Sequence, residues 1–266
     1  MTSRHASVPW SKWGIPAKAK LFIAGPCSVE SEKQVMRTAI TLSKYEVSAL
    51  RGGIWKPRTR PGSFEGVGAK GLVWLKNAGR AAKLPVATEV ANPRHVELCL
   101  KAGIDILWIG ARTSTNPFNV QEIANALRGV DVPVMIKNPI NPDIELWIGA
   151  IERIRSAGVK KIIAVHRGFS AYQKARYRNQ PIWKIPIELK RQLPNVPLVC
   201  DPSHISGNRK YVFEIAQEAM DFLFDGLMIE VHPDPDQALC DGPNSIYLKD
   251  FEKALPRLID LFVNLW

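Results

Sequence analysis

The feature that most restricts the fold of this chain is a series of eight short apolar runs, which end about 21 to 37 residues apart. Each run is rich in Val, Ile and Leu and is bounded by turn-forming or charged residues, which is typical of β-strands. Their nearly continuous apolar character favours parallel strands that are buried on both faces. The runs cover residues 21–25, 48–55, 84–90, 106–111, 133–138, 161–167, 197–204 and 226–232.

The segments between the runs have the spacing of amphipathic helices. In residues 32–44, Val35 and Ala39 share one apolar face, and Ser28 or Ser31 can cap the start of the helix. Later segments carry proline near their starts and Ala-Gly pairs near their ends, which are typical helix boundaries. These signals lie at Pro93, Pro142, Pro181, 102–103 and 157–158.

Eight strands that alternate with helices predict an α/β fold, a single (β/α)8 TIM barrel of about 250 residues. A doubly wound open sheet is the alternative, but it favours a GxGxxG turn where this chain has Gly25, Pro26 and Cys27. We predict a catalytic barrel over residues 21–257. Residues 1–20 are expected to form a short N-terminal extension, as a hairpin or an arm across the bottom of the barrel, and residues 258–266 an apolar C-terminal tail.

Composition excludes several classes of protein. Hydrophobic residues make up 46% of the 266 residues and charged residues 23%, which excludes a disordered or collagen-like chain. No apolar run reaches the length of a membrane helix, and residues 1–20 lack the apolar core of a signal peptide, so we expect a cytoplasmic protein. The four cysteines are too few for a disulfide scaffold and follow no zinc-finger spacing.

The chain is basic, with 36 Lys and Arg against 25 Asp and Glu and a net charge of +11. Such an excess suits either nucleic acid or small anionic substrates. The basic residues are spread along the chain, and even the densest stretch, from Arg167 to Arg178, holds only four in twelve residues. We therefore favour small anions and expect neither nucleic acid nor a membrane as a partner.

Ionisable and metal-ligating residues follow the predicted strands, at the end where TIM-barrel enzymes hold their active sites. Each has an ordinary structural explanation when taken alone, but buried unpaired charges are costly, so their shared placement predicts a functional site. They are Cys27, Arg51 with Lys56 and Arg58, Glu89, Arg112, Lys137, His166 with Arg167, Asp201 with His204, and Glu230 with His232.

The basic members of this set predict a site for anions. Six cations around one cavity repel each other unless anions bind there, and Arg and Lys are the usual ligands of phosphate and carboxylate. The set is large enough for two phosphates and a carboxylate; the alternative is solvated surface charge. Its members are Arg51, Lys56, Arg58, Arg112, Lys137 and Arg167.

A second set, Cys27, His204, Glu230 and Asp241, offers a thiolate, an imidazole and two carboxylates. This mixture suits one divalent transition metal, and we expect Mn²⁺, with Fe²⁺, Co²⁺ or Zn²⁺ as alternatives. The first, seventh and eighth strands are neighbours in a closed barrel, so the first three residues converge, and Asp241 reaches them from the following loop. For Cys27 alone, a buried thiol that binds nothing is an equally good interpretation.

Seven stretches of the chain resemble 3-deoxy-D-arabino-heptulosonate 7-phosphate (DAHP) synthase of the type I beta subgroup. They are GPCSVES (25–31), LRGGIWKPRTRPGSFEG (50–66), GART (110–113), IKNP (136–139), HRGFS (166–170), DPSHISG (201–207) and IEVHPDPDQALCDG (229–242). The resemblance covers residues 20–255. It implies a metal-dependent barrel enzyme that condenses phosphoenolpyruvate with erythrose 4-phosphate and water, giving DAHP and phosphate, at the first step of the shikimate pathway.

The resemblance also implies a role for each residue of the two sets. Arg58 and Thr59 match the ligands of the erythrose 4-phosphate phosphate, and Lys56 and Arg51 match residues that face the carboxylate of phosphoenolpyruvate. The mixed set of four residues matches the metal ligands. The clamp on the phosphate of phosphoenolpyruvate is matched by Arg112, Lys137 and Arg167.

Two alternative functions remain open. The sibling enzyme, 3-deoxy-D-manno-octulosonate 8-phosphate synthase, takes arabinose 5-phosphate and has KANR where this chain has KPRT, from Lys56 to Thr59. This difference favours the four-carbon sugar. A catalytically silent barrel that acts as a regulatory or binding subunit is the other alternative, and the presence of every expected residue disfavours it.

The proton transfers need side chains of their own. Lys137 is the expected proton donor, because neighbouring arginines would lower the pKa of its ammonium group, and Glu89 is expected to hold the attacking water. His204 is a third catalytic candidate, although a metal ligand is less available for this task. Cys240 is expected to approach Cys27 in the metal-free protein, where a disulfide would inactivate the enzyme reversibly.

Some DAHP synthases carry an N-terminal regulatory domain, for which 20 residues are too short, and others a C-terminal chorismate mutase domain. The tail at 258–266 is strongly apolar for a solvated terminus. We expect it to pack on the barrel, to form an interface in a homo-oligomer, or to lead to a chorismate mutase domain or partner.

Overall fold

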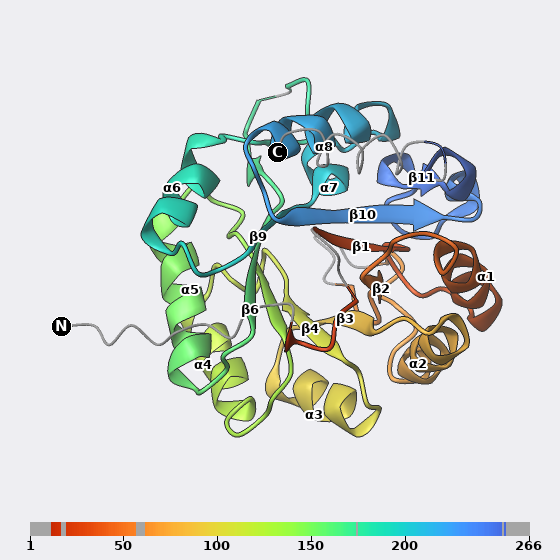
Figure 1. Ribbon diagram of the computed structural model, residues 1–266, viewed down its shortest axis with the longest axis horizontal. Helices are drawn as coiled ribbons and strands as arrows, with labels where there is room; N and C mark the ends of the chain where they lie inside the picture. Colours follow the sequence, from red (N-terminus) through yellow and green to blue (C-terminus); the bar gives the residue numbers. More distant parts are fainter. Residues whose placement is uncertain (1–11, 17–19, 57–61, 174, 252, 254–266) are drawn as a thin grey trace.

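The computed structural model describes residues 12–16, 20–56, 62–173, 175–251 and 253. Parallel strands form a closed barrel inside a ring of helices (Figure 1). Pairing of β1 with both β2 and β10 closes the sheet, so the predicted TIM barrel is confirmed and the open doubly wound sheet is excluded. The barrel strands are β1 (Leu21–Gly25), β2 (Ala49–Arg51), β3 (Val86–Val90), β4 (Ile106–Ile109), β5 (Val134–Lys137), β6 (Ile162–His166), β9 (Leu198–Cys200) and β10 (Gly226–His232).

The helices begin and end where the sequence signals indicate. Ser31 caps the first helix by accepting a hydrogen bond from the backbone of Gln34, and Pro93 is the first residue of the third. None of the described helices is long and apolar enough to cross a membrane. The helices are α1 (Glu32–Leu42), α2 (Lys70–Ala82), α3 (Pro93–Lys101), α4 (Pro117–Ala126), α5 (Ile144–Ser156), α6 (Lys184–Gln192), α7 (Pro202–Ser206) and α8 (Val212–Asp221).

The inward face of the barrel changes from apolar to charged along each strand. Successive side chains of a strand point to opposite faces, so residues two apart share the interior. The apolar interior includes Ala49, Ala87, Met135, Val165, Val199 and Met228. Two residues further toward the carboxyl end stand Arg51, Glu89, Lys137, Arg167, Asp201 and Glu230. The alternation therefore brings the charged residues to one end of the barrel.

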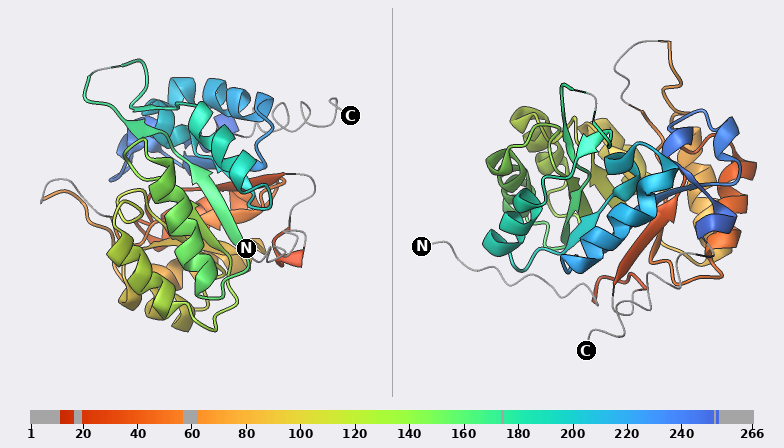
Figure 2. Two further views of the ribbon diagram at one scale, coloured as in Figure 1. Left: turned by 90° about the vertical axis from the view of Figure 1, so that its left-hand side faces the viewer. Right: turned by 90° about the horizontal axis from the view of Figure 1, so that it is seen from above.

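The opposite end of the interior is covered by part of the N-terminal extension. Trp13 and Ile15 are buried in the same apolar cluster as the inward residues of the strands, and Figure 2 (right) shows their segment below the start of β1. Trp13 and Ile15 therefore lie where an arm across the bottom of the barrel would place them. The domain boundaries stay predictions, and the apolar tail at 258–266 lies outside the described residues.

Short elements that the sequence analysis did not predict lie at the carboxyl end of the barrel. β7 (Phe169–Ser170) and β8 (Asn179–Gln180) form an antiparallel hairpin, and β11 (Ile246–Tyr247) pairs with the end of β10. Figure 2 (right) shows the hairpin and the segment after β10 at the same end of the barrel. Three short 3-10 helices accompany them: η2 (Arg209–Tyr211), η3 (Pro235–Gln237) and η4 (Gly242–Asn244).

His166 is a correction to the set of strand-end residues. Val165 points into the barrel, so its neighbour His166 points outward, and the imidazole is fully buried beside the rings of Trp147, Phe169 and Trp183. Burial in this apolar setting lowers the pKa of His166 from 6.5 to about 3. The residue belongs to the packing between barrel and helices, and its placement in the site was wrong.

This burial predicts a pH-dependent loss of stability. Between pH 6.5 and pH 3, the unfolded chain binds a proton at His166 that the folded chain does not, so stability falls as the pH falls through this window. From pH 7 to pH 5, the contribution of this one group is about 2 kcal/mol. We expect His166→Phe to remove it, so that urea unfolding at the two pH values shows a smaller loss than in the wild type. An equal loss in both proteins would contradict the assignment.

Candidate active site

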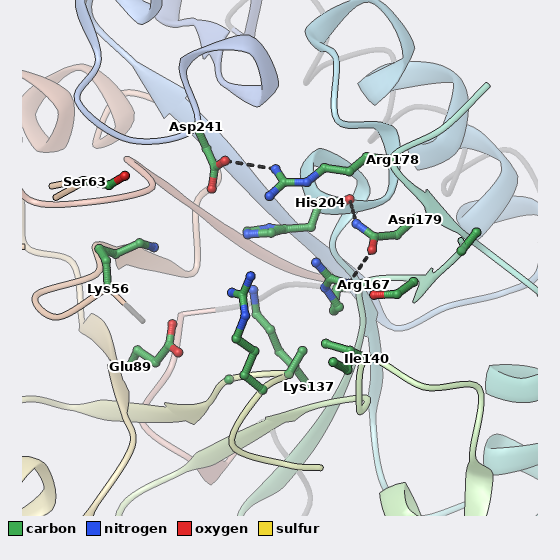
Figure 3. A pocket seen from close by; sticks show the side chains of 15 residues that line it. Lys56, Ser63, Glu89, Lys137, Ile140, Arg167, Arg178, Asn179, His204 and Asp241 are labelled. Atoms are coloured by element: carbon green, nitrogen blue, oxygen red, sulfur yellow. Dashed lines mark hydrogen bonds and ion pairs between the residues drawn. The ribbon is translucent and has the colours of Figure 1, made fainter. Parts of the chain in front are cut away.

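A cavity of about 590 Å³ opens at the carboxyl end of the barrel, and charged side chains from different strands face it (Figure 3). The predicted site residues Arg58 and Thr59 lie outside the described residues. Arg51, Cys27 and Glu230 are buried next to the cavity and do not line it. The predicted residues that line it are Lys56, Glu89, Arg112, Lys137, Arg167, His204 and Asp241.

The buried carboxylate of Asp201 organises the floor of the site. Its Oδ2 accepts a hydrogen bond from Lys137 Nζ at 2.7 Å, lies 2.8 Å from His204 Nδ1, and is 4.0 Å from the Arg51 guanidinium. Burial alone would raise the pKa of Asp201, but His204, Lys137 and Arg51 together hold it well below 3.8. The carboxylate is therefore ionised and fixes the positions of its three partners.

Arg51 joins this cluster to Glu230 beneath the cavity. Its Nη2 donates to Glu230 Oε1 at 3.1 Å, and its guanidinium lies 5.0 Å from the centre of the Trp108 ring. Both charged side chains are almost completely buried, at 1% and 0% exposed. A buried ion pair of this kind is costly to break. Arg51 therefore holds Glu230 in position, whether or not Arg51 also contacts a substrate.

Lys56 and Arg167 face the cavity with neutral hydrogen-bond partners. Lys56 Nζ donates to the backbone oxygen of Cys27 at 3.2 Å, and Arg167 Nη1 donates to the side-chain oxygen of Asn179 at 2.8 Å. Burial would lower the pKa of Lys56, but the nearby thiols and carboxylates raise it above 10.5, so the group is charged. Two fixed positive charges that contact no carboxylate in the described part of the chain suit an anionic ligand.

Glu89 also lines the cavity, and two neighbouring residues fix the position of its carboxylate. Its Oε2 accepts a hydrogen bond from Trp108 Nε1 at 3.0 Å. Its other oxygen approaches Gly110 so closely that a Cβ at that position would lie 2.1 Å from it, so only glycine allows this arrangement. One carboxylate oxygen thus faces the cavity at a position that the indole and the glycine define.

The four predicted metal ligands lie together in two overlapping groups. Ligand atoms of His204, Glu230 and Asp241 lie within 4.8 Å of one another, as do those of Cys27, Cys240 and Asp241. Asp201 faces His204 Nδ1, which leaves Nε2 directed toward Glu230 at 3.7 Å. This carboxylate–histidine arrangement is typical of metal sites.

Two further observations show that these residues fit a divalent metal. The second carboxylate oxygen of Glu230 is buried and has no hydrogen-bond partner among the described residues. Burial lowers the pKa of His204, against the effect of Asp201, so the imidazole is neutral, which is the form that binds metals. A cation at this position would satisfy the buried oxygen.

Cys27 and Cys240 are free thiols in direct contact, with a distance of 2.9 Å between the sulfur atoms. The hydrogen bond to Cys240, together with burial, raises the pKa of Cys27 well above 9. The same hydrogen bond lowers the pKa of Cys240. The predicted approach of Cys240 to Cys27 is confirmed, whereas disulfide formation stays a prediction.

Sequence reasoning missed two residues of the cavity, Arg178 and Asn179. Arg178 donates to Asp241 Oδ1 at 2.9 Å, and Asn179 bridges Arg167 to the backbone oxygen of His204 (Figure 3). They stand at the second strand of the β7–β8 hairpin, which is too short to leave a periodic pattern. The basic stretch ending at Arg178 was the available signal.

Comparisons with known proteins agree with this geometry. The family model described as the DAHP synthetase I family matches residues 15–265. A phospho-2-dehydro-3-deoxyheptonate aldolase of Thermotoga maritima is 37% identical over 236 residues, which cover 89% of this chain and 68% of that protein. A 2-dehydro-3-deoxyphosphooctonate aldolase of Desulfotalea psychrophila is 31% identical over 258 residues, covering 90% of this chain and 88% of the other.

Solved structures give the same result. The crystal structure of the phospho-2-dehydro-3-deoxyheptonate aldolase of Thermotoga maritima superposes with a TM-score of 0.83 and 33% identity, covering 92% of this chain and 70% of the other. A truncated form of 3-deoxy-D-arabino-heptulosonate 7-phosphate synthase from the same organism gives a TM-score of 0.79 and 30% identity, covering 91% and 86%. The family model alone spans most of the sequence. This chain belongs to the DAHP synthetase I family.

Proposed function

We propose that the chain is a metal-dependent 3-deoxy-7-phosphoheptulonate synthase, which condenses phosphoenolpyruvate with erythrose 4-phosphate and water to give DAHP and phosphate. The observation that carries this proposal is the cavity itself. Cations with neutral partners, Lys56 and Arg167, face it, and the candidate metal ligands His204 and Asp241 stand on its wall. Family membership supplies the names of the substrates.

The cations hold the two anionic substrates beside each other. Arg112, Lys137 and Arg167 would bind the phosphate of phosphoenolpyruvate, and Lys56 its carboxylate. Arg51, which the resemblance also assigns to that carboxylate, lies beneath the cavity and would contribute its charge from there. Arg58 and Thr59 would take the phosphate of the sugar. Fixing two reactants in attack geometry is worth up to about 7–11 kcal/mol in favourable systems.

The reaction forms a carbon–carbon bond and a carbon–oxygen bond from water, and it breaks the carbon–oxygen bond to the phosphate. C3 of phosphoenolpyruvate bonds to the aldehyde carbon, whose oxygen takes up a proton. Water adds to C2, and the bond between C2 and the phosphate oxygen breaks, which releases inorganic phosphate. Of the two protons of the water, one is accepted by the site and the other leaves with the phosphate. The site must therefore donate one proton to the aldehyde oxygen and accept one from water.

Cys27, His204, Glu230 and Asp241 would hold the metal, for which we propose Mn²⁺. A divalent ion bound there acts as a Lewis acid that polarises the aldehyde carbonyl. The protein supports this by keeping His204 neutral and Asp241 ionised, because its surroundings lower the pKa of both groups. The identity of the ion depends on supply as well as on these ligands.

Lys137 is the proposed proton donor to the aldehyde oxygen. Burial lowers the pKa of its ammonium group below 10.5; Asp201 opposes this effect and Arg51 adds to it. Its Nζ is within 2.7 Å of Asp201, so the proton is held in a defined direction. Glu89 would accept a hydrogen bond from the attacking water through the oxygen that faces the cavity.

The first test follows the loss of the enol absorbance of phosphoenolpyruvate in chelator-treated protein. We expect no loss before Mn²⁺ is added, and after its addition a loss with erythrose 4-phosphate but none with arabinose 5-phosphate. Consumption with the five-carbon sugar alone would show the octulosonate activity, which several relatives of about 30% identity carry in their names. No consumption with either sugar would leave a catalytically silent barrel as the remaining interpretation.

The role of Lys137 is tested by two substitutions. Lys137→Arg keeps the positive charge next to Asp201 but cannot release a proton near neutral pH. Since general acid catalysis contributes about 10²–10⁴-fold, we expect kcat to fall by that order in both Lys137→Arg and Lys137→Met. Circular dichroism serves as the control for folding. Near-normal kcat in Lys137→Arg would show that the side chain acts only as a cation.

The contact between the two thiols predicts reversible oxidation of the metal-free protein. After treatment of the chelator-stripped wild type with a thiol oxidant, we expect denaturant to expose two free thiols where the reduced chain has four cysteines. Cys240→Ser should keep its three thiols, and Mn²⁺ should protect the wild type by occupying Cys27. Four thiols in the oxidised metal-free protein would contradict the prediction.

A further inference from the structure

Each carboxylate of the candidate metal site is bound by an arginine through one oxygen only. Arg51 pairs with Glu230 Oε1 at 3.1 Å, and Arg178 pairs with Asp241 Oδ1 at 2.9 Å. The other oxygen of Glu230 is buried without a partner among the described residues, and Asp241 Oδ2 lies 3.4 Å from the sulfur of Cys27. Asp241 Oδ2 is thus directed at the cluster of ligands, whereas Glu230 Oε1 faces both Arg51 and, at 3.7 Å, His204 Nε2.

Asp241 depends on its surroundings for this orientation. Its backbone is left-handed, with φ 48° and ψ 34°, a conformation that side-chain-bearing residues adopt rarely. Its backbone oxygen accepts hydrogen bonds from the backbone of Asn244 and Ser245, which fixes the turn. The side chain accepts only long hydrogen bonds from the thiols of Cys27 and Cys240 among the described residues, and the ion pair with Arg178 supplies a closer contact.

Arg178 is itself held in place from several sides. Its backbone N–H donates to the backbone oxygen of Ser206. With the oxygen and nitrogen of the Asn244 amide exchanged, the amide oxygen accepts from Arg178 Nη1 at 2.9 Å and the amide nitrogen donates to the backbone oxygen of Gly207. Two residues earlier, Arg176 packs against the rings of Tyr177 and Tyr211 and pairs with Glu214. The hairpin segment is therefore fastened to α8, and the guanidinium points to Asp241 (Figure 3).

We propose that Arg178 is a positioning residue that sets the affinity of the metal site by holding Asp241 Oδ1, so that Oδ2 faces the metal. This inference rests on the proposed function, because it presumes that Asp241 is a metal ligand. Groups that orient ligands in this way commonly contribute 10–100-fold to metal affinity. The repulsion between the guanidinium and the cation acts in the opposite direction, and we expect the orienting effect on Asp241 to exceed it.

The test measures Mn²⁺ affinity in chelator-stripped full-length protein, from the electron paramagnetic resonance signal of free Mn²⁺. We expect Arg178→Met to bind about 10–100-fold more weakly than the wild type, and Arg178→Lys to recover part of the loss. Arg191→Met is the matched control, because it removes the same charge from an exposed ion pair with Glu188 on α6, outside the hairpin and the cluster of ligands; it should bind as the wild type does.

A double-mutant cycle separates this mechanism from general damage. Asp241→Asn is the suitable partner, because Asn tolerates the left-handed backbone. If Arg178 acts through Asp241, the double variant Arg178→Met with Asp241→Asn should bind Mn²⁺ no more weakly than Asp241→Asn alone. Losses that multiply in the double variant, or an equal loss in Arg191→Met, would overturn the proposal.

The remaining outcomes distinguish a failure of the role proposed for Arg178 from a failure of the proposed metal site. Unchanged or tighter Mn²⁺ binding in Arg178→Met, together with a raised KM for a substrate, would overturn the inference and make Arg178 a ligand of a substrate anion. A wild-type protein that binds no Mn²⁺ would remove the metal site and this inference with it. Melting temperatures of the metal-free variants check that the fold is intact in each comparison.

Discussion

The structure of the site depends on the buried carboxylate of Asp201. Lys137, His204 and Arg51 are all fixed by this one group, and Arg51 carries the effect on to Glu230. The positive charges of Arg51 and Lys137 balance the carboxylates of Asp201 and Glu230, so this cluster can remain buried at the centre of the barrel. Removing one partner of such a cluster is costly, so substitutions that conserve charge are the informative ones.

This cluster divides the cations of the site into two kinds. Arg51, Arg178 and Lys137 contact carboxylates and keep them in position, whereas Lys56 and Arg167 donate to neutral oxygens and keep their charge available to an anion. The division matters for function, because the same barrel end must bind two anionic substrates and a cation.

Much of the site could be predicted from the sequence because strand residues alternate strictly. Ala49 and Arg51, or Met135 and Lys137, share the inward face, so a charge two residues after an interior apolar residue lies in the site. The same rule explains why His166 was misplaced, since it directly follows the inward Val165. His232 was also predicted at the site, but it does not line the cavity and lies 3.6 Å from Glu30. Arg178 and Asn179 could not be found in this way, because a hairpin with two-residue strands has no detectable period.

The sequence by itself determined the eightfold alternation of strands and helices, the end of the barrel that carries the charges, and the two residue sets for anions and metal. These are properties of local periodicity and of residue type. The tertiary structure decided which charge pairs with which, because ion pairs such as Arg178 with Asp241 join segments 63 residues apart. The approach of Cys240 to Cys27 across 213 residues was expected from the sequence only because Cys240 precedes the candidate ligand Asp241. Contacts of that range depend on how the loops fold over the barrel, which local patterns along the chain do not encode.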